Sequence, residues 1–167
     1  MLIRPVKSSE YSVVGQLILD AYNGLPGRTP EPDYDLQLLD VERRVNEGVA
    51  VMVAIDDDGE LLGAVSYVGD PGSPYMEFDI PGAVSFRHLA VAQSAQARGI
   101  GRMLVEWCIG EAMADGRQRI VIHSGEWMLG AHRLYERLGF VRGEHVREFE
   151  AKGSGLLVRL FEYAKEL

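Results

Sequence analysis

The sequence predicts an α/β fold in which a mixed sheet carries helices on both faces. Apolar, β-branched runs of strand length alternate along the chain with stretches whose apolar residues recur every three or four positions, as on a helix. Glycine and proline cluster between these segments and mark turns and loops. Strands and helices that alternate in this way are typical of a layered domain with one central sheet.

Length and composition indicate one ordinary globular domain. The 167 residues suit a single domain over residues 1–167, and no repeat or low-complexity linker divides it. No apolar run is long enough to span a bilayer, and the opening residues turn polar too early for a signal peptide. The one cysteine, Cys108, cannot form an internal disulfide and is expected in the core. We therefore expect a cytoplasmic protein.

Two helices are expected near the N-terminus, after a strand over residues 2–6. Ser8 or Ser9 is expected to cap the first helix, which ends near Gly24. A proline-rich loop follows, and Asp35 is expected to cap a second helix. The residues expected to point inward from this second helix are Leu36, Leu39 and Val45, and the residue expected to stop it is Gly48.

Six further strands and two further helices are expected in the rest of the chain. An Asp-Gly dipeptide between apolar runs over residues 49–55 and 61–68 is a strong signal for a hairpin. The later elements are a loop over 69–82, strands over 83–91, 120–123, 140–146 and 156–161, and helices over 99–114 and 127–138. The last two strands are expected to pair antiparallel.

A glycine-containing loop, Gln96-Ala97-Arg98-Gly99-Ile100-Gly101, stands where a strand passes into a helix. A helix N-terminus offers unpaired N–H groups and the positive end of the helix dipole, which attract anions. Glycine lets a phosphate approach the backbone closely, and Arg98 and Arg102 add positive charge. The pattern therefore indicates a phosphate site, although an ordinary helix start can show the same letters.

Two other glycine loops are excluded by detail. The dinucleotide-binding fingerprint needs a third glycine, and Leu104 stands at that position. The phosphate loop of nucleotide triphosphatases ends in Gly-Lys-Ser or Gly-Lys-Thr, which the chain does not contain.

A second motif, Leu134-Tyr135-Glu136-Arg137-Leu138-Gly139-Phe140, ends the next helix and leads into a strand. A strand, a Q-x-x-G-x-G loop, a helix, a strand and a helix ending in L-Y-E-x-L-G-F resemble the GNAT superfamily of N-acetyltransferases, closely from Ser85 to Arg142. The resemblance implies the GNAT fold, with a mixed, mostly antiparallel sheet. It also implies acetyl-coenzyme A as co-substrate, no metal, and transfer of the acetyl group to a primary amine by direct attack in a ternary complex.

The resemblance further implies which residues form the site. Tyr135 holds the place of the tyrosine that protonates the departing thiolate and also contacts the cofactor. Met128 replaces an asparagine that contacts the pantetheine arm in many members, and a thioether cannot replace both functions of that amide. The other residues implied to bind the cofactor, mostly through the backbone, are Leu89, Ala90, Val91, Gln96, Ala97, Arg98, Gly99, Ile100, Gly101 and Arg102.

The general base is left open at this stage. His88 and His123 are the titrating candidates, because histidine alone changes charge near neutral pH without help. The carboxylates with a comparable claim are Glu77, Asp79 and Glu126. Alternatives to an N-acetyltransferase also stay open. One is a protein that binds acyl-coenzyme A without turnover, as a sensor or structural paralogue, and the other is a transferase of another acyl group or one that acts on a hydroxyl.

Charge is distributed unevenly along the chain. Residues 1–84 carry 5 Lys and Arg against 15 Asp and Glu, whereas residues 85–167 carry 12 against 10, for a total of −8. So acidic a chain argues against nucleic acid or a membrane surface as partner. We expect a small-molecule or peptide amine, and the family suggests a homodimer. The acidic half makes a cationic acceptor one expectation; solubility is the alternative explanation of the same acids.

Overall fold

Seven strands form one sheet in the computed structural model, which describes residues 1–152 and 155–167. Their order is β1-β2-β3-β4-β5-β7-β6, and every neighbouring pair is antiparallel except β4–β5. The strands are β1 (Leu2–Pro5), β2 (Ala50–Ile55), β3 (Leu61–Val68), β4 (Ala83–Val91), β5 (Arg119–Gly125), β6 (Val141–Glu150) and β7 (Leu157–Glu166). The predicted mixed, mostly antiparallel sheet is confirmed.

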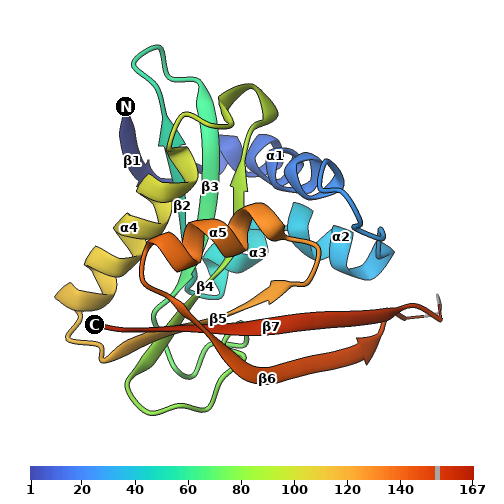
Figure 1. Ribbon diagram of the computed structural model, residues 1–167. Helices are drawn as coiled ribbons and strands as arrows, with labels where there is room; N and C mark the ends of the chain where they lie inside the picture. The colour runs from blue at the N-terminus through green and yellow to red at the C-terminus, as the bar shows by residue number, and fades with distance from the viewer. Residues whose placement is uncertain (153–154) are drawn as a thin grey trace.

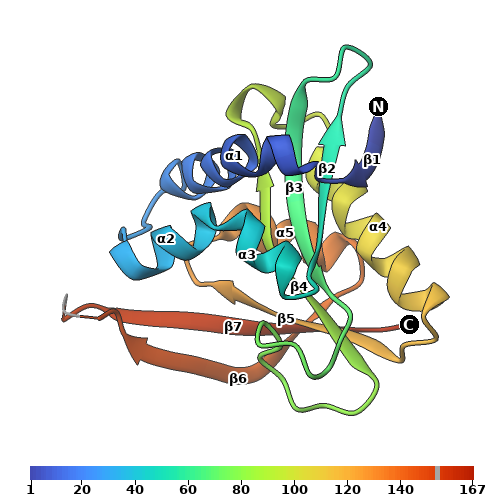
Figure 2. The same cartoon turned by 180° about the vertical axis from the view of Figure 1, so that it is seen from behind.

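Helices cover both faces of this sheet, as predicted. Figure 1 shows α4 and α5 in front of the strands, and Figure 2, seen from behind, shows α1, α2 and α3 over the opposite face. The helices are α1 (Tyr11–Asn23), α2 (Pro32–Leu39), α3 (Val41–Asn46), α4 (Ile100–Ala114) and α5 (Leu129–Arg137), with 3-10 turns at Ser8–Glu10 and Gln93–Ala95. Within the described residues, none of these helices combines the length and the apolar character that crossing a membrane requires.

Two apolar clusters hold these layers together, one on each side of the sheet. Leu104 and Cys108 of α4 are fully buried in the first cluster, and Val14 and Ile18 of α1 are fully buried in the second. Cys108 is therefore a core residue, as predicted, and burial raises the pKa of its thiol. A thiol that stays protonated in an apolar layer does not act as a nucleophile.

The second predicted helix is in fact two helices, and the prediction that Asp35 caps it is wrong. The first begins at Pro32, whose fixed φ suits the opening turn. The chain leaves helical geometry at Asp40, whose carboxylate accepts a hydrogen bond from the Arg43 N–H and so caps α3. Leu36, expected inside, is 65% exposed, because α2 turns Leu38 rather than Leu36 into the core.

The boundaries near the C-terminus also differ from the prediction. Helix α5 begins at Leu129 rather than Trp127, and Gly139, with φ of +84°, follows its end as predicted. The last two strands pair antiparallel as expected, but each is ten residues long, because the hairpin extends well past the sheet's other strands. Residues 160–166 of β7 pair with β5, and the hairpin extends beyond β5 at its turn end.

Strands β4 and β5 separate almost as soon as they meet. Ala83 pairs with Arg119 and Val84 with Ile120, and no later residue of β4 pairs with β5. Figure 1 shows β5, β6 and β7 running across the direction of β2, β3 and β4. The β5-facing edge of β4 therefore keeps unpaired N–H and C=O groups from Ser85 to Val91, and these can bind another extended chain.

A bidentate ion pair ties β1 to the start of α1 and gives a testable pH dependence. Arg4 donates two hydrogen bonds of 2.8 and 2.6 Å to Glu10, and this contact holds the pKa of Glu10 at about 2. We expect Glu10→Gln to cost about 1 kcal/mol at pH 7, or about 2–4 °C in Tm.

The ion pair stabilises the fold only while Glu10 is ionised. Because the pKa of Glu10 is lower in the folded protein, its contribution to the free energy of unfolding is complete above the unfolded pKa of about 4.3 and disappears as pH falls toward 2. Urea unfolding of the wild type and of Glu10→Gln between pH 7 and pH 3 measures the difference in their free energies of unfolding. We expect this difference to become smaller only below about pH 4.5. A difference that stays constant over that range would contradict the ion-pair explanation.

Candidate active site

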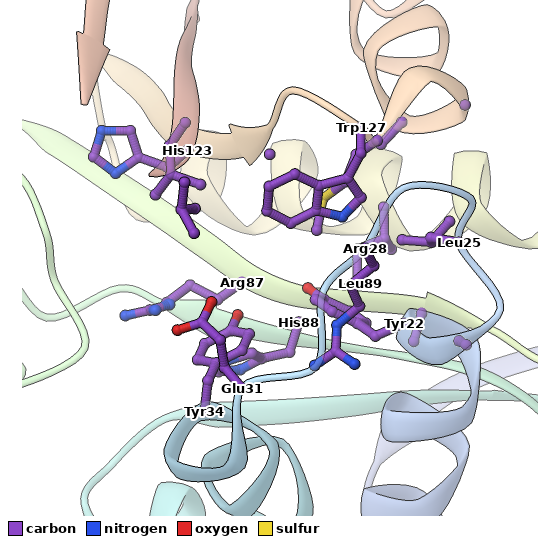
Figure 3. A pocket seen from close by; sticks show the side chains of 18 of the residues that line it. Tyr22, Leu25, Arg28, Glu31, Tyr34, Arg87, His88, Leu89, His123 and Trp127 are labelled. Carbon is purple, nitrogen blue, oxygen red and sulfur yellow. The ribbon is translucent and has the colours of Figure 1, made fainter. Parts of the chain in front are cut away.

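A cavity of about 580 Å³ opens where β4 and β5 separate. Figure 3 shows His123 and Trp127 on one side of it and Arg87, Tyr34 and Arg28 on the other. Its walls come from β4, β5, the β6–β7 hairpin, the beginning of α5, the end of α1, α2 and the loop that joins α1 to α2. The cavity therefore joins the two halves of the chain around the unpaired edge of β4.

A second cavity, of about 540 Å³, surrounds the glycine-containing loop at the beginning of α4. Residues from β4, the loop and α5 line both cavities, namely Val91, Gln96, Gly101, Gly130 and Leu134. A long, narrow ligand can therefore lie with one end at the N-terminus of α4 and the other between β4 and β5.

The loop is shaped to present backbone N–H groups to the second cavity. Ala97 and Gly99 both have positive φ, +61° and +80°, so the chain turns tightly just before α4 begins. No side chain caps the helix at Gly99, which leaves the N–H groups of the first turn without side-chain partners. Arg102 pairs with Glu106 at 2.7 Å on the helix surface, so much of its charge is screened. An anion at this loop would therefore depend chiefly on backbone N–H groups.

The strand residues predicted to bind a cofactor lie along the first cavity. Leu89, Ala90 and Val91 line it, on the part of β4 that has left β5. The first of them is part of a bulge: between the pairs Ser66–Arg87 and Ala64–Ala90, His88 and Leu89 of β4 face one residue of β3. The bulge increases the local twist and turns the edge of β4 toward the cavity.

Tyr135 reaches the same cavity from α5. Its ring packs at 5.8 Å from those of Phe86, Phe140 and Tyr163, and the residue is 5% exposed. Burial raises the pKa of Tyr135, so its hydroxyl keeps its proton throughout the neutral range. Within the described residues the hydroxyl has no hydrogen-bond partner, which leaves it free to donate to a ligand.

His123 also lines this cavity, where it forms a hydrogen-bonded pair with Glu77. Its Nδ1 lies 3.0 Å from Glu77 Oε2, and its side chain is 8% exposed. Burial raises the pKa of Glu77, but the hydrogen bond with His123 and the charges of Arg87 and Arg147 together lower it by more. The pKa therefore lies below its ordinary value, and this carboxylate is ionised. An ionised carboxylate on Nδ1 holds the proton there and leaves Nε2 as the basic nitrogen.

His88 is placed differently. It sits on the bulge with φ of +53°, is 3% exposed, and its Nδ1 lies 3.3 Å from Ser66 Oγ. Burial, with the nearby charges of Arg44 and Arg87, lowers its pKa well below 6.5. A histidine that resists protonation so strongly is a poor acceptor for the proton of an amine.

Trp127 and Met128, just before α5, both shape the cavity, and of the two only Trp127 was not singled out by the sequence. The Trp127 ring lies so close to Gly125 that a Cβ there would meet it at 2.6 Å, which explains the glycine. Met128, in the place of the family's asparagine, also lines the cavity, and Ser124 Oγ lies 3.7 Å from its sulfur. This wall of the cavity is therefore apolar where an amide was expected.

The acidity of the first half of the chain does not collect at the cavity. Its charged lining residues are the bases Arg28, Arg87, Arg147 and Lys152 and the acids Glu31, Asp33 and Glu77. Because the bases outnumber the acids, the net charge is opposite in sign to the one that the cationic-acceptor expectation needs. Most of the acids of residues 1–84 lie elsewhere on the surface.

Comparison with known proteins places both motifs in one family. The sequence profile of the acetyltransferase (GNAT) family matches residues 15–140. The comparison with curated proteins found no match.

Solved structures show the same fold along the whole chain. The ribosomal-protein-alanine N-acetyltransferase of Brucella melitensis is 22% identical with a TM-score of 0.72, and all of each chain is covered. The yncA protein of Salmonella typhimurium, solved with its cofactor acetyl-CoA, is 23% identical with a TM-score of 0.71, over 100% of this chain and 94% of that one. A GCN5-related N-acetyltransferase of Kribbella flavida is 21% identical with a TM-score of 0.73, over 99% and 97%.

Proposed function

The chain belongs to the GNAT family of acetyltransferases, and from that premise we propose that it transfers the acetyl group of acetyl-coenzyme A to a primary amine. The amine attacks the thioester directly while both substrates are bound. The observation that carries the proposal is the splayed edge of β4, which lies between an anion-binding loop at one end and Tyr135 with His123 at the other.

Coenzyme A fits the two joined cavities by its chemistry. Its pyrophosphate would lie at the beginning of α4, bound by N–H groups of the loop from Gln96 to Arg102. Its pantetheine amides would pair with the free edge of β4 at Leu89, Ala90 and Val91, as an added strand does. When bound, the cofactor supplies an activated acetyl group.

The residues of this chain supply the proton transfers. His123, held by Glu77, accepts a proton from the attacking amine at Nε2. Tyr135 donates its hydroxyl proton toward the departing sulfur. Both side chains line one cavity, so the two proton transfers can flank a single reacting centre.

Release of coenzyme A thiol in the presence of a panel of primary amines tests this function. We expect acceptor-dependent thiol release, with the acetylated amine identified by mass spectrometry. Tight binding of acetyl-coenzyme A without thiol release from any amine would instead support the non-catalytic alternative. Comparison of acetyl-, propionyl- and succinyl-coenzyme A decides between acetyl and another acyl group.

Gly101→Val tests the cofactor site. A Cβ at Gly101 would stand 3.3 Å from Leu134 Cδ2 and 3.6 Å from Val91 Cγ2, so the methyl groups of valine would fill the junction of the two cavities. We expect coenzyme A affinity, measured by calorimetry, to fall at least tenfold, or about 1.4 kcal/mol.

Gly110→Val is the matched control, because Gly110 lies in the same helix and its Cβ would meet nothing within 4 Å. It makes the same exchange of glycine for a β-branched residue within the helix and should bind coenzyme A as the wild type does. If the folded Gly101→Val and Gly110→Val proteins bound coenzyme A with equal affinity, the cofactor would not bind at this junction.

A further inference from the structure

One carboxylate faces two guanidinium groups in the cavity between β4 and β5. Glu77 Oε1 lies 3.5 Å from a nitrogen of Arg87 and 3.5 Å from a nitrogen of Arg147, while Oε2 is taken by His123. Arg87 is the less exposed of the two, with a side chain 20% exposed against 50% for Arg147. Arg87 also donates a hydrogen bond of 3.3 Å to the Tyr75 carbonyl. Both ion-pair contacts are long, and a second anion could approach the same guanidinium groups.

The other cations of the cavity already have partners. Arg28 pairs with Asp35, and Lys152 pairs with Asp33 at 3.1 Å on the rim. Once these pairs are set aside, Arg87 and Arg147 remain against Glu77 alone, which leaves one positive charge without an opposite partner at this place. The Arg87 charge, which is partly shielded from water, is stabilised by an oppositely charged ligand.

The cavity also contains one acid that forms no ion pair. Glu31, at the N-cap of α2, has no cationic partner within 4 Å among the described residues. Figure 3 shows Glu31 on the same side of the cavity as Arg87 and Tyr34, across from His123. The cavity therefore offers separate unpaired charges of both signs: a positive one at Arg87 and Arg147, and a negative one at Glu31.

We infer that the acceptor carries an oxyanion as well as the reacting amine, as a free amino acid does. This inference rests on the proposed function, and it names the acceptor class for the same site. The carboxylate binds the Arg87 guanidinium, with Arg147 contributing from the rim, and Glu31 attracts the cationic amine into the cavity without pairing with it. Because Glu77 contacts both Arg87 and His123, a carboxylate on Arg87 places a neighbouring amine close to His123.

Matched acceptors test the inference. Free amino acids and their carboxamides have the same side chain and amine, but the carboxamide lacks the negative charge. We expect kcat/KM to favour the carboxylate at least about tenfold, since a charge-assisted bidentate contact is lost with it. Equal use of both acceptors by the wild type would overturn the inference and leave the acetyltransferase proposal standing.

Arg87→Gln separates recognition from a structural role for this arginine. We expect KM for the amino acid to rise at least about tenfold with kcat changed far less, and the values for the carboxamide to stay within about twofold. Arg87→Lys should recover part of the preference. Arg43→Gln removes a guanidinium that pairs with Glu47 outside the cavity and serves as the charge-matched control. Equal losses on both acceptors in Arg87→Gln would show that Arg87 only holds the fold.

A binding measurement tests the acceptor class even if the protein proves not to be an enzyme. If the protein binds coenzyme A but releases no thiol with any amine, the catalytic proposal fails. Calorimetric titration of the coenzyme A complex with amino acid and carboxamide then decides the acceptor class alone. Binding of the carboxylate that is lost in Arg87→Gln supports the inference, and indifference to the carboxylate overturns it.

Discussion

Replacement of His123 by glutamine should lower turnover by about 10²-fold or more at neutral pH, because the amine then has no base to take its proton. Glutamine can still donate to Glu77, so the 3.0 Å contact has a substitute and the fold should persist. The deficit should narrow as pH rises toward the pKa of the free amine, since an amine that is already deprotonated needs the base less. Steady-state rates from pH 6.5 to 9.5 with a saturating acceptor measure this.

His145→Gln is the matched control for this change. His145 lies on β6, is exposed and does not line the cavity, so its loss should leave turnover unaltered. His88→Gln distinguishes the two candidate bases. A large loss in His88→Gln together with normal turnover in His123→Gln would move the base to the bulge of β4.

The parts of the fold that were predicted well are those whose signals are local. The bounds of β3 and β4 agree with the prediction, because turn-forming residues flank both apolar runs. The second helix was predicted wrongly because the periodicity of its leucines continues across the break at Asp40. A cap that depends on one side chain bonding one N–H is hard to recognise inside an apolar stripe.

In the site, too, the residues that could be predicted are those in continuous motifs. The loop at Gly99 and the motif at Tyr135 are continuous in sequence, so both could be placed before the structure was known. Glu77 and His123 are 46 residues apart and meet only because the loop after β3 folds against β5. Nothing in their immediate sequence marks them as a pair, and periodicity describes single elements rather than contacts between them.

The charge of the cavity could not be predicted from the number of acidic residues in the first half of the chain. The acidic excess of residues 1–84 suggested a cationic acceptor, but most of those acids are directed away from the cavity. A sum over half a chain weights every face of the molecule equally. The electrostatic potential in a cavity depends instead on the few charges that line it and on whether each is already paired.

Tyr135→Phe should lower the turnover number by 10²-fold or more while the Michaelis constants move far less. The hydroxyl makes no hydrogen bond within the described residues, and the ring packing at 5.8 Å from Phe86, Phe140 and Tyr163 survives its removal. Folding and coenzyme A binding should therefore persist, because the lost interaction matters only as the thiolate departs. Since burial raises the pKa of Tyr135, the wild type should also keep its activity up to pH 10 without an alkaline limb from this group.

Tyr163→Phe is the control that makes the result specific. Tyr163 belongs to the same aromatic cluster, but its hydroxyl donates to Glu136 at 3.2 Å and it does not line the cavity. Both variants lose one phenolic oxygen from the same apolar layer, so any general loosening of the core affects them alike. A turnover defect confined to Tyr135→Phe assigns the proton donor to that hydroxyl. Wild-type turnover in Tyr135→Phe would make Tyr135 a core residue, and water would then have to protonate the departing thiolate.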